Sequence, residues 1–420
     1  MADRRLDLDD DALLDAVQRQ TFRYFWDFGH PVSGLARERS VPAFDYGPEV
    51  VTTGGSGFGV MAIVIGAARG WIAREEAVER LLRIVRFLWK ADSYHGVFPH
   101  FLHGATGRTI PFTRNDDGGD LVETSFLIAG LLCARQYFDR DQPEEGALRN
   151  LIERLWLDVE WSWHTRDGAS VLYWHWSPNN GWSMNHEIRG WDEALITYVL
   201  AASSPTYPVD ADVYHLGWAQ GRSFKNNRQY YDITLPLGRN YGGPLFFAHY
   251  SFLGLDPRGL KDRYADYWEQ NVSHVMINRE HCVRNPNRFK GYGADCWGLT
   301  ASDDPDGYRS HAPDNDGGVI APTAAIASLP YTPGHSMRAL RHFYFELGDR
   351  IWGDYGFKDA FDLTRGWYAD SYLAIDQGPI IGMIENHRTG LLWNLFMSCA
   401  EVRAGLRTLG FESPHLHADV

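Results

Sequence analysis

The chain has 420 residues, and its 40 Lys and Arg against 54 Asp and Glu give a formal net charge of −14. A hydrophobic share of 44% with only 22% charged residues can supply a large core, which excludes a disordered chain. The acidic balance argues against a nucleic acid or an anionic membrane as partner, because both are bound through a basic field.

Apolar spacing predicts helices along most of the sequence. The first covers residues 12–28, directly after an Asp-rich run. A second covers residues 74–89, with Ala77, Leu81, Ile84 and Val85 on one face. A helix that is apolar on one side only belongs on the outside of a protein, with its apolar face toward the core.

One feature recurs through the rest of the sequence. A polar segment leads into a glycine pair, or a Gly-Pro or Gly-Trp step, and then into a helix that is apolar nearly all round. The six positions are Gly54, Gly118, Gly190, Gly242, Gly317 and Gly378, spaced 64, 72, 52, 75 and 61 residues apart. This spacing is longer than the usual solenoid repeat of about 20–50 residues and suits a helix pair with long loops.

Helices that are apolar all round belong inside, where one-sided helices cover them. Six inner helices paired with six outer ones predict an all-α fold, an (α/α)6 barrel of twelve principal helices. Six such modules account for nearly the whole length, so we expect one catalytic domain over residues 1–420. The alternative is that the glycines punctuate an irregular helical protein.

The second of these helix starts is the most acidic, with Asp116, Asp120 and Glu123. Asp120 and Glu123 are three residues apart and share a helix face. Carboxylates in a first turn commonly cap a helix and compensate its dipole, which is an equally good account of Asp120. Capping does not explain Glu123, because an unpaired carboxylate inside an apolar helix is costly.

The third and sixth starts each carry one further candidate. Glu193 follows Trp191 and Asp192 and precedes an apolar run, which would raise its pKa and suit a general acid. Asp376 precedes the Gln377-Gly-Pro step, a good position for a base that faces a central cavity. Either carboxylate alone would more often be a cap, but together they match the paired carboxylates of glycoside hydrolysis.

Further side chains near these openings are predicted to hold sugar rings. Tryptophans crowd the segment before Glu193, and flat sugar faces pack well on aromatic rings. Core packing or a plain hairpin is the alternative for each of them. The predicted substrate-binding residues, beyond the acidic cluster, are Trp174, Trp182, Trp191, Gln377 and Arg388.

The sequence contains none of the common motifs of other enzyme classes. The sequence has no HExxH, no GxSxG, no P-loop and no dinucleotide fingerprint. The Asp-rich segments 304–307 and 314–317 lack the distal Glu of a calcium loop, so we expect turns there. Because carboxylates fill both proton-transfer roles, we expect neither a catalytic metal nor another cofactor.

The remaining sequence features concern the compartment. The cysteines Cys133, Cys282, Cys296 and Cys399 are scattered, which favours free thiols over a disulfide framework or zinc finger. The first residues contain no signal peptide and no stretch approaches 18 apolar residues. We expect a cytoplasmic monomer as the chain is given, or a periplasmic or secreted one if it is trimmed.

Several segments resemble glycoside hydrolase family 144, the endo-β-1,2-glucanases once described as "putative glucoamylase". The resemblance runs from about residue 21 to about residue 397. The transglycosylating domain of cyclic β-1,2-glucan synthases is similar in the same places. The matching blocks are GGDLVETSFLIAGLLCARQYFD, GWDEALITYVLAASSPTYPV, WGLTASDDPDGY, GGVIAPTAAIASLPYTP, and GFKDAF followed by IDQGPIIGMIENHRTGLLW.

The resemblance implies an (α/α)6 barrel that acts on a β-glucan oligosaccharide. It places Glu193 at the family's acid position and Asp376 at its base position, and it places Asp116, Asp120 and Glu123 among the cavity carboxylates. The sequence departs from the family at Asp192, where we expect Asn in relatives. A second carboxylate there would raise the pKa of Glu193 further or change which residue donates the proton.

The leading hypothesis is therefore an inverting glycosidase that cleaves β-1,2-glucan. A transglycosylase on the same fold, with a sugar hydroxyl in place of water as acceptor, is the second. A non-catalytic glucan-binding barrel would keep the aromatic residues but would not need Glu193 and Asp376 together. An α-glucan hydrolase is disfavoured, because only the old family name supports it.

Overall fold

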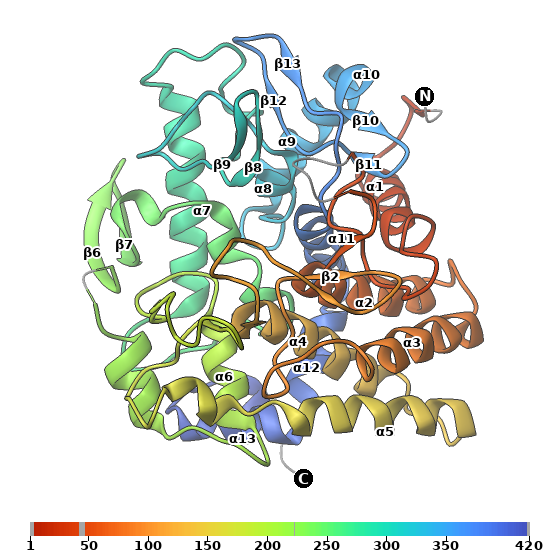
Figure 1. Cartoon of the computed structure of the whole chain (residues 1–420). Helices are drawn as coiled ribbons and strands as arrows, with labels where there is room; N and C mark the ends of the chain where they lie inside the picture. The colour runs from red at the N-terminus through yellow and green to blue at the C-terminus, as the bar shows by residue number, and fades with distance from the viewer. Residues whose placement is uncertain (1–3, 42–46, 222, 418–420) are drawn as a thin grey trace.

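The computed structural model describes residues 4–41, 47–221 and 223–417 and is predominantly helical (Figure 1). Thirteen α-helices lie in this part of the chain. Their bounds are α1 Asp10–Trp26, α2 Thr53–Ala68, α3 Arg74–Leu88, α4 Leu121–Tyr137, α5 Pro143–Asp158, α6 Leu195–Ser203, α7 Tyr267–Arg284, α8 Pro322–Ile326, α9 Pro333–Arg341, α10 Gly348–Ile351, α11 Ala374–Arg388, α12 Leu391–Ser398 and α13 Ala400–Thr408.

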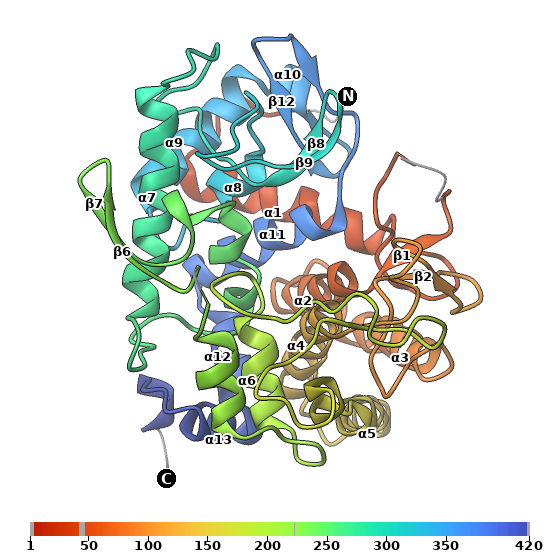
Figure 2. The ribbon, with the colours of Figure 1, turned by 60° about the vertical axis from the view of Figure 1, so that its left-hand side comes forward.

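Small antiparallel sheets accompany the helices, which an all-α prediction does not include. A three-stranded sheet joins β1 Val50–Thr52, β2 Phe101–His103 and β3 Thr109–Ile110. The two-stranded pairs are β4 Gly119–Asp120 with β5 His175–Trp176, β6 Lys225–Tyr230 with β7 Ile233–Leu237, β8 Ala301–Asp304 with β9 Gly307–Ser310, β10 Trp352–Gly353 with β11 Gly356–Phe357, and β12 Phe361–Asp362 with β13 Trp367–Tyr368. In Figure 2, β8, β9 and β12 lie together above α8 and α11.

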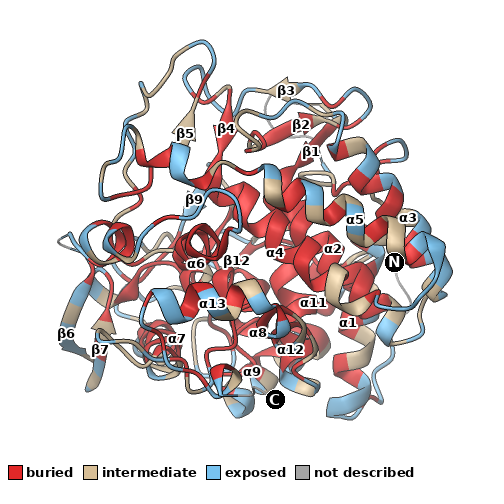
Figure 3. Ribbon diagram, turned by 90° about the horizontal axis from the view of Figure 1, so that it is seen from below, coloured by how far each residue is buried: buried red, intermediate tan, exposed pale blue. Residues whose placement is uncertain are grey.

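The helices divide into buried and one-sided ones, as the sequence predicts. Nearly every residue of α2, α4, α6 and α11 is buried, whereas α3 and α5 bury one face each. Figure 3 shows the buried helices at the centre and the exposed faces of α3 and α5 toward the edge. The predicted helix 74–89 is confirmed within one residue. The predicted helix 12–28 begins two residues earlier, because Asp9 caps α1 by accepting a hydrogen bond from the Ala12 N–H at 2.9 Å.

The helices predicted at the glycine-marked positions agree with the structure to different extents. Gly54, Gly118 and Gly190 lie at or shortly before α2, α4 and α6, and Gly378 lies inside the first half of α11. The helix predicted after Gly317 is short, because α8 ends at Ile326 and prolines follow it.

The predicted helix after Gly242 is wrong. Three short 3-10 helices, Asn240–Gly242, Leu245–Ala248 and Ser251–Leu253, stand in its place. Gly242 and Gly243 have φ angles of 94° and 86°, in the left-handed region that a right-handed helix does not contain. A continuous helix therefore cannot pass through these two residues, and the segment after Pro244 forms separate 3-10 turns.

Glycines also allow the central helices to approach one another. α2 packs on both α4 and α11. A methyl group on Gly57 would overlap the backbone of Phe126, and one on Gly130 would overlap the carbonyl group of Gly57. The glycine pattern therefore marks close helix crossings as well as helix starts.

One continuous cluster of buried hydrophobic side chains extends from Leu8 to Leu416. Each of the four cysteines is buried with a free thiol, as expected. In the described ranges, no helix combines the length and the apolar character that crossing a bilayer requires.

The α2–α4 crossing can be tested by substitution. Gly130→Ala should lower the free energy of unfolding by about 1–3 kcal/mol, because an added methyl group in a tightly packed site forces the backbone to move. Chemical denaturation measures the change. Gly146→Ala in α5 is the matched control, since its methyl group would meet only Arg149 Nη2 at 3.9 Å. Equal stability of the two variants would contradict the close crossing.

Candidate active site

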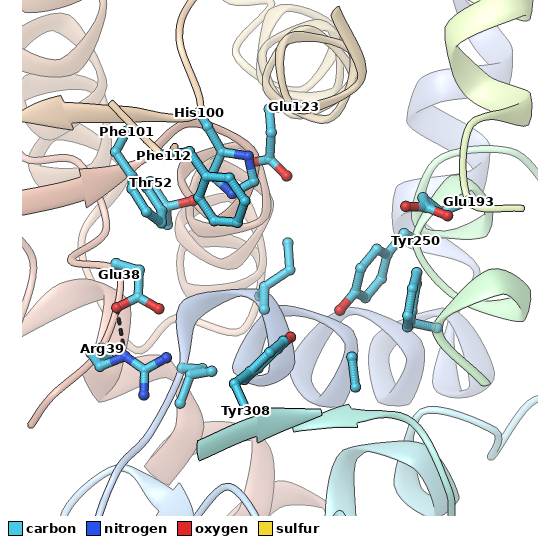
Figure 4. A pocket seen from close by; sticks show the side chains of 14 residues that line it. Glu38, Arg39, Thr52, His100, Phe101, Phe112, Glu123, Glu193, Tyr250 and Tyr308 are labelled. Atoms are coloured by element: carbon cyan, nitrogen blue, oxygen red, sulfur yellow. Dashed lines mark hydrogen bonds and ion pairs between the residues drawn. The ribbon is translucent and has the colours of Figure 1, made fainter. Parts of the chain in front are cut away.

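A cavity of about 330 Å³ opens where β1, β2, α4, the residues before α6, the β8–β9 hairpin and the start of α11 meet (Figure 4). Glu123 and Glu193 lie on two sides of it, with Tyr250 near Glu193 and Tyr308 below both in this view. The lining residues are Glu38, Arg39, Thr52, His100, Phe101, Phe112, Glu123, Glu193, Phe246, Tyr250, Ala301, Tyr308, Leu373 and Ile375.

Glu123 is held in the cavity wall by a backbone N–H of α2. Its Oε2 accepts a hydrogen bond from the Gly54 N–H at 2.7 Å, and a side chain on Gly54 would place its Cβ 2.5 Å from that oxygen. Asp120 caps α4 by accepting from the Val122 N–H and the Glu123 N–H at 3.1 and 2.9 Å. Asp120 is thus a cap, and it fixes the turn from which Glu123 projects.

Two histidines balance the charge of this acidic group. His100 Nδ1 lies 3.1 Å from Asp120 Oδ2, and His175 Nε2 lies 3.3 Å from Asp116 Oδ2 and 3.5 Å from Asp120 Oδ2. Burial alone would lower the pKa of both histidines. The negative charge of Glu123 and the bond to Asp120 nevertheless raise the pKa of His100 to about 9, and the bonds to Asp116 and Asp120 raise that of His175 to about 10. Both histidines are therefore cationic at neutral pH.

Glu193 lies in the irregular turn before α6, and its pKa is raised as a general acid requires. Desolvation by the surrounding protein raises its pKa well above the ordinary value, and the charge of Asp192 raises it further. Desolvation likewise raises the pKa of Asp192 to about 7, although Asp192 Oδ1 accepts from the Ala194 N–H at 2.9 Å. The second carboxylate beside Glu193 acts on its pKa in the direction that the sequence predicts.

Asp376 lies in the first turn of α11, directly after Ile375, and is only 2% exposed. Its neighbours Leu373 and Ile375 line the cavity. Burial and the charge of Asp359 hold the pKa of Asp376 well above the ordinary value. Burial raises the pKa of the Tyr250 hydroxyl, and the charges of Asp376, Glu193 and Glu123 raise it further, so all three carboxyl groups lie near this hydroxyl.

The predicted tryptophans lie outside the cavity wall. Trp191 is buried and packs on Trp218 and Tyr267, which corrects its assignment from sugar contact to core. Trp174 donates from Nε1 to Asp120 Oδ1 at 2.9 Å, so it supports the acidic group. Trp182 packs near Trp163 and Tyr173 in the segment before Glu193. This segment includes strand β5, in line with the hairpin that is the alternative to sugar stacking.

The side chains of Gln377 and Arg388 also make contacts within the protein. Gln377 is buried and donates from Nε2 to the Phe357 carbonyl at 2.9 Å. Arg388 is the last residue of α11 and donates to Gln18 Oε1 at 2.8 Å. At 1.5 Å per residue, its twelve-residue separation from Asp376 places it about 18 Å along the helix. The predicted substrate contact of Arg388 is therefore corrected to a contact with α1.

Sequence reasoning missed several lining residues. Arg39 donates to Glu38 Oε2 at 2.7 Å and to Asp303 Oδ1 at 2.8 Å, and so connects an N-terminal loop to β8. Tyr308 projects from β9, the hairpin whose turn 304–307 was predicted. Asp303 and Tyr308 both lie in the block WGLTASDDPDGY, and the match of this block to the family is the sequence signal that could have identified them.

Among the described residues, one group of side chains brings three potential metal ligands together, with atoms of His100, Asp116 and Asp120 within 4.8 Å of one another. The negative charge of Glu123 and the bond to Asp120 raise the pKa of His100, so its protonated form compensates the carboxylates when no metal is bound.

Chelation tests this assignment. We expect exhaustive dialysis against EDTA to leave turnover unchanged, because protonated His100 and His175 already compensate the carboxylates. The rate before and after dialysis, with and without added divalent cations, is the measurement. A loss that a metal restores would contradict the expectation.

A cavity with carboxyl groups on several sides and aromatic rings between them is typical of glycoside hydrolases. The profile of the family described as "Putative glucoamylase" matches residues 185–400, and the chain belongs to this family. The resemblance to glycoside hydrolase family 144 is confirmed by the relatives below.

Three relatives illustrate the similarity. The exo beta-1,2-glucooligosaccharide sophorohydrolase (non-reducing end) of Parabacteroides distasonis is 47% identical over 421 residues, covering 95% of this chain but 58% of that protein. The chain thus spans less than two thirds of this relative. A crystal structure from Bacteroides uniformis, described as a putative glucoamylase, is 60% identical with a TM-score of 0.96, covering 98% of this chain and 100% of that one. An endo-beta-1,2-glucanase from Chitinophaga pinensis, in complex with sophorotriose and glucose, is 56% identical with a TM-score of 0.95, covering 97% and 100%.

Proposed function

We propose that this chain is a glycoside hydrolase that cleaves β-1,2-linked glucan with inversion at the anomeric carbon. The observation that carries the proposal is that Glu193 lines the cavity while Asp376, buried next to the lining residue Ile375, acts with Glu193 on the same Tyr250 hydroxyl. Relatives that align over nearly the whole chain are named as acting on β-1,2-glucan, which supports the linkage.

The proposed architecture is one (α/α)6 barrel domain over residues 1–420. Residues from several glycine-marked segments support it, because they meet at the same cavity: Thr52, Glu123, Glu193, Phe246 and Ile375. Segments that are far apart in the sequence but open on one space are expected at the mouth of a helical barrel.

In the proposed reaction, Glu193 donates its proton to the glycosidic oxygen as the bond to the anomeric carbon breaks. Asp376 accepts the proton of the attacking water, directly or through a substrate hydroxyl. Phe112, Tyr250 and Tyr308 supply ring faces and hydroxyls along the cavity, which suit a sugar chain. Glu193 thus acts as acid and Asp376 as base.

The test is the product profile over time on linear β-1,2-glucan, with β-1,3-glucan and α-1,4-glucan as controls. Hydrolysis produces one new reducing end per cut, and NMR of the early product shows the inverted anomer. Redistribution of chain lengths without new reducing ends would indicate a transglycosylase. Saturable binding without turnover would indicate a glucan-binding barrel, and turnover of only the α-1,4-glucan would overturn the linkage.

A further inference from the structure

Asp376 has a second buried carboxyl group beside it. Asp359 lies in the loop between β11 and β12 and, like Asp376, is 2% exposed. Asp359 Oδ1 and Asp376 Oδ2 are both buried and meet no N–H or O–H donor in the described ranges. Each carboxyl group shifts the pKa of the other through a side-chain hydrogen bond, so the two groups lie close enough to share a proton. A hydrogen bond between two carboxyl groups requires one proton between them.

The surroundings place that proton on Asp376. Asp359 Oδ2 accepts from the Asp303 N–H at 2.7 Å, which favours the ionised form of Asp359. Burial and the charge of Asp303 raise the pKa of Asp359 to about 7, whereas burial and the charge of Asp359 raise that of Asp376 further. In the free protein Asp376 therefore donates to Asp359, and a base that already holds a proton cannot accept another.

The other charged groups around the pair are fixed by ion pairs. Arg39 joins Glu38 and Asp303, and the Ser371 hydroxyl donates to the second oxygen of Asp303. This arrangement holds the Asp303 backbone N–H against Asp359. The titratable and charged groups that face the pair from neighbouring elements are Tyr24, Glu38, Arg39, Tyr250, Asp303 and Tyr308.

We propose that Asp359 is a positioning residue that takes over the proton of Asp376 and so frees Asp376 to act as the base. The inference rests on the proposed function. The proton moves along the hydrogen bond from Asp376 to Asp359, and Asp376 then accepts the proton of the attacking water, directly or through a substrate hydroxyl. The new C–O bond forms as the glycosidic C–O bond breaks and Glu193 protonates the leaving oxygen.

The protons balance over the cycle. The pair starts with one proton and a charge of −1 and ends with two protons and no charge, while Glu193 goes from neutral to −1. Release of one proton to water by the pair and uptake of one from water by Glu193 restore the starting state. No oxidant, metal or cofactor takes part in this sequence.

The test is the pH dependence of kcat/KM on linear β-1,2-glucan for Asp359→Asn. Asparagine keeps the size of the side chain and can accept the Asp303 N–H, but it removes the shared proton and one negative charge. We expect the acidic limb of the profile to move at least one pH unit toward acid, since Asp376 no longer has a like charge beside it. We expect kcat to fall by about 10–100-fold, because an isolated Asp376 is a weaker base.

Two further variants separate this role from a structural one. Asp362→Asn is the matched control, because Asp362 is equally buried in β12 and accepts only from loop N–H groups, Thr364 N at 2.7 Å and Arg365 N at 3.1 Å, besides a 3.9 Å ion pair. It should leave the acidic limb in place. Asp359→Glu, which retains a carboxyl group, should restore most of the wild-type profile.

The outcomes are distinguishable. If Asp359→Asn folds and its pH profile has the same acidic limb as that of the wild type, the role of Asp359 is overturned and the proposed function stays intact. Wild-type protein without turnover of β-1,2-glucan would overturn both. If Asp359→Asn does not fold, Asp359→Ser removes the same charge and leaves room for a water molecule, and the same shift of the limb is expected.

Discussion

Replacing Glu193 with glutamine should reduce turnover of β-1,2-glucan by about 10²–10⁴-fold, the range that one positioned acid contributes, while glucan binding stays measurable. Glutamine keeps the shape of the side chain and its place in the cavity wall but has no acidic proton to donate. Desolvation and the charge of Asp192 raise the pKa of Glu193, which favours the protonated form that an acid needs. The rate of new reducing ends and calorimetric titration with a β-1,2-linked oligosaccharide measure the two effects.

The matched control is Glu187→Gln. Glu187 is only six residues away, accepts from Arg189 Nε at 2.9 Å and from the Tyr173 hydroxyl at 3.2 Å, and does not line the cavity. Its variant should retain wild-type turnover. A near-normal rate for Glu193→Gln would overturn the assignment, and Asp192 and Glu123 would then be the candidates for the acid.

The sequence predicts helices best where burial is uniform or one-sided. The one-sided pattern of α3 and the continuous apolar runs of α2, α4 and α6 are local properties, and the structure agrees with them. The segment after Gly242 has a similar apolar composition, but it forms short 3-10 helices, and the left-handed pair Gly242 and Gly243 interrupts the backbone at its start. Composition predicts that this segment is buried, whereas backbone conformation decides its shape.

The candidate site shows the same division between local and distant information. Glu123 and Glu193 follow glycine-marked starts, so a local pattern identifies them, and both line the cavity. The contact between Arg39 and Asp303 joins residues 264 positions apart, and no spacing rule predicts such a pair. The density of tryptophans cannot separate sugar stacking from core packing, because both use the same ring faces, and Trp191 belongs to the core.

Asp376→Asn should also reduce turnover by about 10²–10⁴-fold, since asparagine cannot accept a proton as a base. Reducing-end release on β-1,2-glucan measures the loss, and Asp362→Asn is again the control because it is buried to the same extent. Either a small effect of Asp376→Asn or an equal loss in both variants would count against Asp376 as the base.

The same substitution should stabilise the folded chain, increasingly as the pH rises. The pKa of Asp376 lies well above its ordinary value when folded, so above about pH 4 the folded state retains a proton that the unfolded chain releases. Stability of the wild type therefore falls with rising pH in this window, by at most about 1.4 kcal/mol per pH unit. Asparagine does not titrate, and its amide N–H can still donate a hydrogen bond to the Asp359 carboxylate. Thermal unfolding should show Asp376→Asn to be more stable than the wild type at pH 8, with a difference that shrinks toward pH 4. Equal unfolding temperatures at pH 8 would show that the pair holds no such proton.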